Sequence, residues 1–318
     1  MSAIEVLEIL VYPGLVLLLT LAFFYEWIDR KFFARVQNRI GPMFAGPAGI
    51  LQPLADFIKL ISKEDIVPAA CDKLVFNAAP IFYFALPLTA LFFVPIATQS
   101  GLIAFDGDLI FMMFIFTLIV ITVFLAGWSS MNRFSIIGGV RAALEMLSYE
   151  IPLALAMIGP ALAAGSLSIS SIAQWESGHA SWGLWLQPIG FGTAIICMLA
   201  ELEFVPFDIP EAETEIVAGW RTEFSGRKLA LFKLGRDLEL VLASALITSL
   251  FLGGAQQVGI VPPIVTFLAK TISVILLFSF LRSLFARFRI DQMTSGMWKY
   301  LLPIAVMQLL LILFGIGK

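Results

Sequence analysis

The residues most able to do chemistry gather in the segment Ala200–Glu239. This segment holds nine of the chain's 23 carboxylates and five of its 20 lysines and arginines. It lies between two long apolar runs, and its first acids fall inside the end of one of them. A carboxylate inside a bilayer costs roughly 2.5–3.5 kcal/mol on insertion scales, so acids in such a place indicate a functional site.

Acids that are partly buried and close together cannot all ionise cheaply, so such a group can take up and release protons. A line of carboxylates therefore predicts an ion-translocation relay, for H+ or equally for Na+, which also prefers oxygen ligands. If the apolar run continues as a helix, Glu201 and Glu203 lie ~200° apart on opposite faces of it. The alternative is ordinary inner-surface charge paired with arginines. The predicted relay consists of Glu145, Glu150, Glu201, Glu203, Asp208, Glu211, Glu213, Glu215, Asp237 and Glu239.

The composition predicts an all-α integral membrane protein. Sixty per cent of the 318 residues are hydrophobic and only 14% are charged, more apolar surface than a soluble domain can hide. With two cysteines, one histidine and no C-x-x-C motif, the chain offers no ligand set for an iron–sulfur cluster, haem or zinc. We therefore expect no cofactor in this chain, and any redox centre in partner subunits.

Apolar runs of about the ~20 residues needed to cross a bilayer predict eight transmembrane helices in a single domain over residues 1–318. A ninth helix, over residues 48–63, has apolar side chains at helical spacing but is too short and polar to span. It is predicted to lie in the membrane interface. The predicted spans are about 9–27, 78–98, 109–127, 149–165, 188–205, 238–256, 264–286 and 299–316.

The distribution of positive charge predicts the orientation. Loops 29–77, 128–148, 206–237 and 287–298, with the adjoining helix ends, hold 18 of the 20 lysines and arginines. Because short inner loops carry an excess of Lys and Arg, these loops are placed inside and both termini outside.

Several short motifs then point to a family. They are Asp29–Arg30–Lys31 with Ala34–Arg35–Val36–Gln37, Leu51–Gln52–Pro53–Leu54–Ala55–Asp56, Gly127–Trp128–Ser129–Ser130, Ser148–Tyr149–Glu150–Ile151–Pro152, Ala200–Glu201, Pro206–Phe207–Asp208, Glu211–Ala212–Glu213 and Asp291–Gln292. With these motifs the chain resembles the H subunit of bacterial NADH–quinone oxidoreductase, the complex I membrane subunit next to the hydrophilic arm. It is also similar to the counterparts in membrane-bound hydrogenases and related archaeal complexes.

The resemblance implies a multi-pass subunit of the prokaryotic plasma membrane that couples electron transfer to H+ or Na+ translocation. It implies iron–sulfur and hydrogenase-like partners on the inner face, antiporter-like membrane partners, and no nucleic acid. Iron–sulfur clusters, and nickel–iron in hydrogenase-like relatives, would lie in those partners. The residues implied to border the docking site or a quinone-like cavity are Arg30, Arg35, Arg39, Asp56, Phe57, Arg141 and Arg221.

The sequence also departs from quinone-reducing members. Glu203 and Phe204 stand where those members usually have Asn-Arg, and Arg236–Asp237 where they usually have Glu-Tyr. Glu145 replaces a neutral polar residue. These changes favour a hydrogenase-like or sulfur-reducing branch. The alternatives are a quinone or phenazine site in an NADH- or deazaflavin-oxidising dehydrogenase, a stand-alone cation–proton antiporter, and a purely structural anchor.

Overall fold

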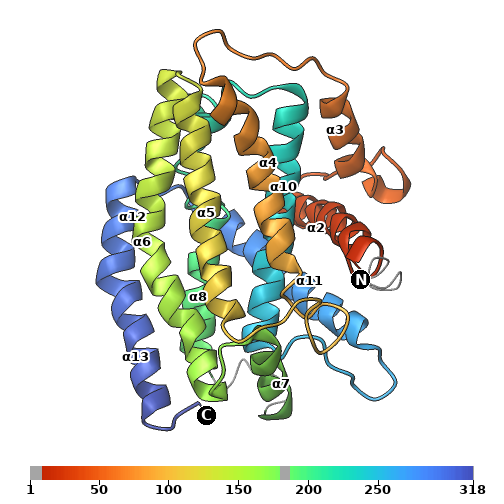
Figure 1. Cartoon of the computed structure of the whole chain (residues 1–318), viewed down its shortest axis with the longest axis vertical. Coiled ribbons are helices and arrows are strands. Elements are labelled where there is room, and N and C mark those ends of the chain that lie inside the picture. The colour runs from red at the N-terminus through yellow and green to blue at the C-terminus, as the bar shows by residue number, and fades with distance from the viewer. Residues whose placement is uncertain (1–8, 180–186, 318) are drawn as a thin grey trace.

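Figure 1 shows a computed structural model of the chain, which describes residues 9–179 and 187–317. Within these ranges the protein is helical, with one isolated bridge between Val258 and Val261 and no strand. The predicted all-α class is therefore confirmed.

Among the described residues, eight helical segments overlap the predicted spans. They are α2 (Leu15–Val36), α4 (Lys73–Leu91), α5 (Asp108–Ser129), α6 (Arg133–Ala164), α8 (Pro188–Glu201), α10 (Gly226–Phe251), α11 (Pro263–Leu284) and the continuous run of α12 (Ile290–Gly296), the π-helical turn η4 (Met297–Leu301) and α13 (Leu302–Leu313). Among the described residues, five are long and apolar enough to cross a membrane: α4, α5, α6, α11 and the last run. Because α8 is short and α2 and α10 carry several charges, eight spans and the placement of both termini outside stay predictions.

Shorter elements connect these helices. They are η1 (Pro47–Gly49), α3 (Gln52–Ile61), α7 (Ile169–His179), α9 (Glu213–Ile216) and η3 (Gly219–Arg221). Helix α3 lies within the predicted interfacial helix and packs beside α2 and α10. Helix α7 lies at the end of the bundle opposite the loop 62–72 (Figure 1).

Most helix ends differ from the predicted ones by several residues: α2, for example, runs from Leu15 to Val36, where a span over 9–27 was predicted. Three of the differences affect the site. Helix α6 begins at Arg133, inside a predicted loop, because the Asn132 side chain accepts a hydrogen bond from Phe134 N (2.9 Å) and caps the helix. Helix α10 begins at Gly226, so the charged predicted loop before residue 238 is partly helical. Helix α8 ends at Glu201, and Glu203 takes a left-handed backbone (φ 50°). The prediction that Glu201 and Glu203 share one helix was therefore wrong.

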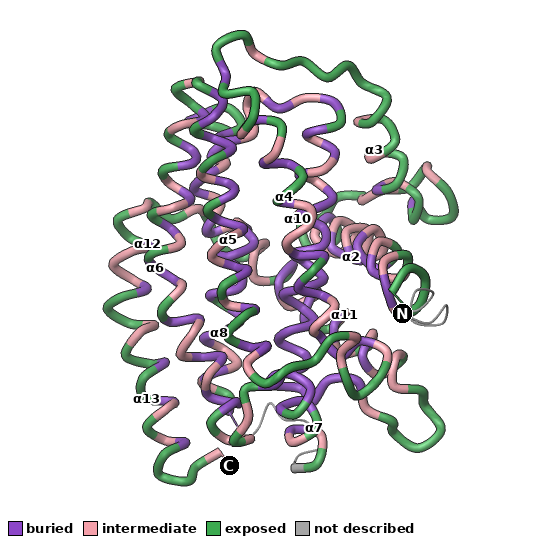
Figure 2. Tube along the Cα trace, viewed as in Figure 1, coloured by how far each residue is buried: buried purple, intermediate pink, exposed green. Residues whose placement is uncertain are grey.

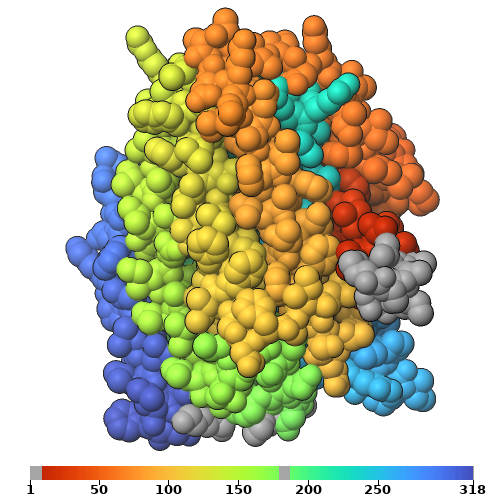
Figure 3. Space-filling view, in the orientation of Figure 1, coloured from red at the N-terminus to blue at the C-terminus, as the bar shows by residue number. Residues whose placement is uncertain are grey.

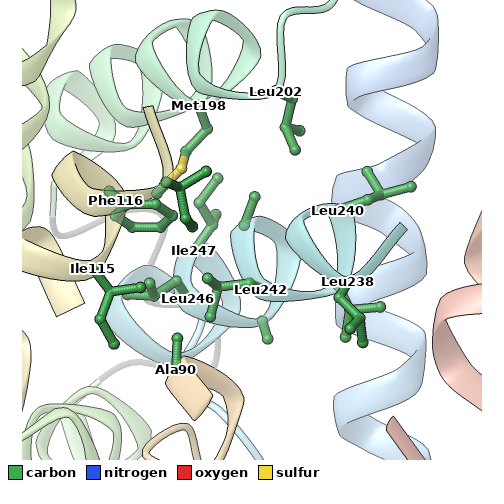
Figure 4. Close-up of a cluster of buried hydrophobic side chains, with 14 of the residues drawn as sticks. Ala90, Ile115, Phe116, Met198, Leu202, Leu238, Leu240, Leu242, Leu246 and Ile247 are labelled. Carbon is green, nitrogen blue, oxygen red and sulfur yellow. The ribbon is translucent and has the colours of Figure 1, made fainter. Parts of the chain in front are cut away.

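Helix α10 is the central helix of the molecule. Every residue from Asp237 to Phe251 is buried (Figure 2), as expected of a helix surrounded by others. It contacts α2, α4, α7, α8 and α11. Figure 4 shows its leucines, among them Leu242 and Leu246, against side chains from α4, α5 and α8. This position carries Asp237 and Glu239 into the interior.

Helices α4, α5 and α6 lie side by side on one face (Figure 3). Helices α5 and α6 pack closely through glycine: a Cβ added at Gly127 would lie 2.5 Å from Ser135 O and 3.2 Å from Gly139 Cα. The same α5–α6 face exposes apolar side chains such as Phe114 and Leu147. It is therefore suited to lipid or to another membrane helix.

Candidate functional site

A cavity of about 600 Å³ opens between α2, α10, α11 and the segment that follows α8. Charged side chains dominate its lining, with six acids and five bases among 17 lining residues. They are Glu26, Asp29, Glu203, Asp208, Glu211 and Asp237, with Arg30, Arg221, Lys233, Arg236 and Arg282. Apolar walls are added by Phe33, Leu60 and Phe204. We call this space the inner cavity.

Arg30 forms two ion pairs at one rim of the inner cavity. Its guanidinium is 2.6 Å from Glu26 on the same helix and 2.8 Å from Asp56 on α3. Lys233 of α10 approaches the same Asp56 carboxylate at 3.7 Å. Burial would raise the pKa of Asp56, but hydrogen bonds from Arg30 and Gln52 and the charge of Lys233 lower it. The surface helix is thus fixed to the cavity by an ionised carboxylate.

The opposite rim is the segment 202–225. Glu211 forms ion pairs with Arg221 and with Arg236 of α10, the latter at 2.8 Å. Both carboxylate oxygens of Asp208 accept hydrogen bonds from the Arg287 guanidinium, and the distance from Nε to Oδ1 is 2.7 Å. Burial, together with the neighbouring charge of Arg236, lowers the pKa of Arg221 to about 10. These pairs attach the segment to α10 and to the residues that follow α11.

Asp29 and Arg282 form a buried ion pair in the wall. Asp29 is 2% exposed, lies 3.0 Å from Arg282 and accepts a hydrogen bond from Ser279. The Arg282 guanidinium stacks 3.9 Å from the ring centroid of Phe33 and 4.8 Å from that of Phe204. Cation–π contacts of this kind hold a desolvated guanidinium in one orientation.

Three carboxylates lie beyond the cavity wall: Glu145 on α6, Glu201 at the end of α8 and Glu239 on α10. Their exposed fractions are 2%, 6% and 3%. Glu239 accepts a hydrogen bond from Tyr83 (2.9 Å), and Glu201 has the Tyr149 hydroxyl as its partner. Neither oxygen of Glu145 has a partner among the described residues. In the described part of the chain, none of the three forms a salt bridge.

Glu203 connects these buried acids to the inner cavity. It lines the cavity, and Trp220 Nε1 donates to its carboxylate at 3.4 Å. It also lies within electrostatic range of both Glu145 and Glu239. The η3 backbone at Trp220 packs closely against α6 at Gly138. A Cβ added at Gly138 would lie only 2.5 Å from Trp220 N, so glycine permits this approach.

A further acid, Glu150 of α6, lies toward the α5–α6 face. It accepts a hydrogen bond from Thr117 of α5. Both residues line a small cavity of about 70 Å³ together with Tyr149 and Glu201. The neighbours of Glu150 on α6 include Leu147, which is 58% exposed. The acids therefore run from the inner cavity, through the bundle, to a lateral face.

Other residues predicted for the site lie at its edge or outside it. Glu213 and Glu215 are exposed on α9, and Arg141 pairs with Glu215 at 2.7 Å. Arg35 and Arg39 are exposed and do not line the inner cavity. On α3, the Phe57 ring lies 5.8 Å from the Phe23 ring. No group of three His, Cys, Asp or Glu side chains suited to a metal occurs within the described ranges.

Sequence reasoning did not select several residues that complete the site. Glu26 and Arg282 lie near the ends of predicted spans. A charged side chain in such a place could have identified them as candidate site residues. Tyr83 and Tyr149 carry no such signal, because only the packing of α4 on α10 and of α6 on α8 brings their hydroxyls to the acids.

Comparison with known proteins identifies the family of this chain. A family model described as NADH dehydrogenase matches residues 8–313. The chain belongs to the NADH dehydrogenase family. Similar relatives include the H subunits of NADH-quinone oxidoreductase from two strains of Dehalococcoides mccartyi, each 38% identical over 292 residues, which cover 92% of this chain and 82% of the relative. The resemblance found in the motifs is therefore confirmed.

Phe204 and Arg236, two positions at which the motif resemblance implies departures from quinone-reducing members, are in contact. The Arg236 guanidinium lies 5.5 Å from the ring centroid of Phe204 and donates to the carbonyl oxygens of Leu202 and Glu203 (3.1 and 3.2 Å). In this chain α10 supplies the guanidinium, and the segment after α8 supplies the aromatic ring. Phe204 and Arg236 thus form a single contact within the cavity wall.

Proposed function

We propose that this chain is the membrane-anchoring and coupling subunit of a respiratory oxidoreductase related to complex I. In this proposal a peripheral redox module docks on the inner face above the inner cavity. Its electron transfer changes the charge in the cavity, and the buried acids pass that change on to H+ or Na+ translocation. The redox centres lie in partner subunits, and this chain holds none.

The observation that carries the proposal is the set Glu145, Glu201 and Glu239, three buried carboxyl groups without a basic partner among the described residues. Each desolvated carboxylate is costly, and three in one space repel one another. The number of protons they hold therefore depends on nearby charge. The paired charges of the inner cavity lie next to them through Glu203, so a change in the cavity has a direct electrostatic effect on the group.

The inner surface supports docking of a partner. It combines exposed charge on Arg35 and Glu213 with large exposed apolar side chains: Phe44 is 98% and Trp128 is 54% exposed. Mixed surfaces with aromatic anchors are typical of protein interfaces. We propose iron–sulfur subunits as occupants of this surface, and antiporter-like membrane subunits on the α5–α6 face where Glu150 lies.

The proposal is tested by purifying the intact complex from its membrane in mild detergent and identifying its subunits by mass spectrometry. We expect iron–sulfur proteins and further membrane subunits to co-purify with this chain. Recovery of the chain alone, with ion transport by the lone chain in liposomes, would contradict the proposal and support an antiporter.

The departures around Phe204 and Arg236 favour the hydrogenase-like or sulfur-reducing branch as the finer proposal. A partner with two C-x-x-C pairs suited to nickel–iron, and no flavin subunit, would support that branch. The second candidate is a quinone or phenazine site. It is favoured by the name of the relatives and by a cavity whose volume suits a small-molecule ligand and which adjoins Leu60 of the surface helix. A flavin-binding partner would support it.

The contact between Phe204 and Arg236 predicts a specific double-mutant result. Phe204→Arg alone places a third guanidinium beside Arg236 and Arg282, so the complex should melt at a lower temperature. Arg236→Glu in the same chain gives the new arginine an acidic partner and should recover part of the loss. We expect a coupling energy of about 0.5–3 kcal/mol, the range for residues in contact. Strictly additive effects on the melting of the complex would contradict an energetic coupling between positions 204 and 236.

A further inference from the structure

Helix α7 buries an acid that the proposed function does not use. Apart from Ser170, whose hydroxyl accepts a hydrogen bond from Gly101 N at 3.1 Å, its buried positions are Ile169, Ile172, Ala173 and Glu176, which follow the i, i+3, i+4, i+7 spacing of a single helix face. Three of them are apolar, as this face requires, and the fourth is a glutamate that is 0% exposed. Neither carboxyl oxygen has a hydrogen-bond partner among the residues that the structure describes.

The packing around α7 offers Glu176 no opposite charge. The helix lies against α10 and α6. No charged residue occurs in α10 from Leu240 to Phe251 or in α6 from Ile151 to Ala164. Ser249 of α10 lies beside α7, at the turn that contains Gly254. Its buried hydroxyl has no partner among the described residues.

The charged groups nearby are already engaged. Asp108 of α5 accepts a hydrogen bond from the first amide of α7, Ile169 N, at 2.6 Å. Lys270 of α11 donates to the carbonyl oxygens of Leu252 and Gly254, at 2.6 and 3.1 Å. On α7 itself the other titratable residue is His179, which ends the helix.

We propose that Glu176 is a proton-binding site at the outer end of the molecule and that its protonated, neutral form holds α7 against α10. A neutral carboxyl group can stay on an apolar helix face, whereas an isolated carboxylate cannot stay there cheaply. Ionisation therefore releases α7 from the bundle. This inference concerns the end of the bundle opposite the inner cavity and does not depend on the proposed function.

The direction of the pH dependence follows from burial, which raises the pKa of Glu176 from 4.5 to about 8 in the docked helix. When α7 opens, the group returns to its ordinary value. Between these two values the docked state binds more protons than the open state, so docking weakens as pH rises. The opening constant should increase about tenfold per pH unit between about pH 5 and 8, and should level off above pH 8.

The test is hydrogen–deuterium exchange of the α7 peptide in the purified complex from about pH 5.5 to about pH 9, corrected for intrinsic exchange. The wild type should show the tenfold slope, and Glu176→Gln should keep α7 protected without a slope. Glu176→Met provides a second neutral side chain in case the glutamine variant does not assemble. Asp106→Asn, which removes an exposed acid at the same end, should keep the wild-type slope. A flat wild-type profile, or a slope retained in a neutral variant, would overturn the proposal.

Discussion

Replacement of Glu201 by glutamine should stop ion translocation while leaving the complex assembled. Glu201 lies between the other buried acids and Glu150, and glutamine keeps its shape and its contact with Tyr149 but cannot exchange a proton. Proton transfer through a positioned group is typically worth ~10²–10⁴-fold in rate, so we expect coupled translocation to fall by about 10²-fold or more. The measurement is ion uptake per electron transferred in vesicles that contain the purified complex.

Two further variants make this result specific. Glu64→Gln removes an exposed acid from the inner loop and should leave the ratio of ions to electrons unchanged. Glu201→Asp keeps a titratable group at a shorter reach and should retain part of the translocation. Normal ion uptake in Glu201→Gln would rule out a relay role for this residue, and a loss of assembly would assign it a structural one.

Replacement of Asp29 by alanine should strongly destabilise the complex. The substitution leaves Arg282 charged, buried between Phe33 and Phe204 and without its acidic partner. Removing one member of a buried ion pair typically costs about 3–5 kcal/mol, because the remaining charge is uncompensated. We therefore expect a clear fall in the melting temperature of the detergent-solubilised complex.

The same reasoning predicts a partial rescue. Arg282→Met in the Asp29→Ala chain removes the uncompensated charge and leaves an apolar side chain of similar length between the two rings, so much of the stability should return. Asp291→Ala is the matched control, because the Arg289–Asp291 pair is 3.8 Å long and both side chains are about 80% exposed. Exposed pairs contribute little, so this variant should melt like the wild type. Equal effects of Asp29→Ala and Asp291→Ala would contradict the buried-pair argument.

Local sequence signals were sufficient for the fold class and for the position of the acids along the chain. Apolar runs and amphipathic spacing identified the helices, since helical periodicity is a property of neighbouring residues. The motifs around Glu150, Glu201 and Asp208 identified the family. Helix ends were predicted less well: charge was taken as a sign of a loop at residues 133–148 and 226–237, which are helical, and side chains such as Arg141 and Lys228 there pair with Glu215 and Asp65.

Only the tertiary structure decided which of these acids are buried and which side chains they contact. Tyr83 meets Glu239 across 156 positions, and Asp29 meets Ser279 across 250, through the packing of helices distant in sequence. The same packing placed Glu213 and Glu215 on the surface while it buried Glu145, although all three are acids near the predicted inner side. The sequence alone thus determined the membrane class, the family and the candidate acids. Burial and partner choice depend on contacts between distant segments, which local patterns do not encode.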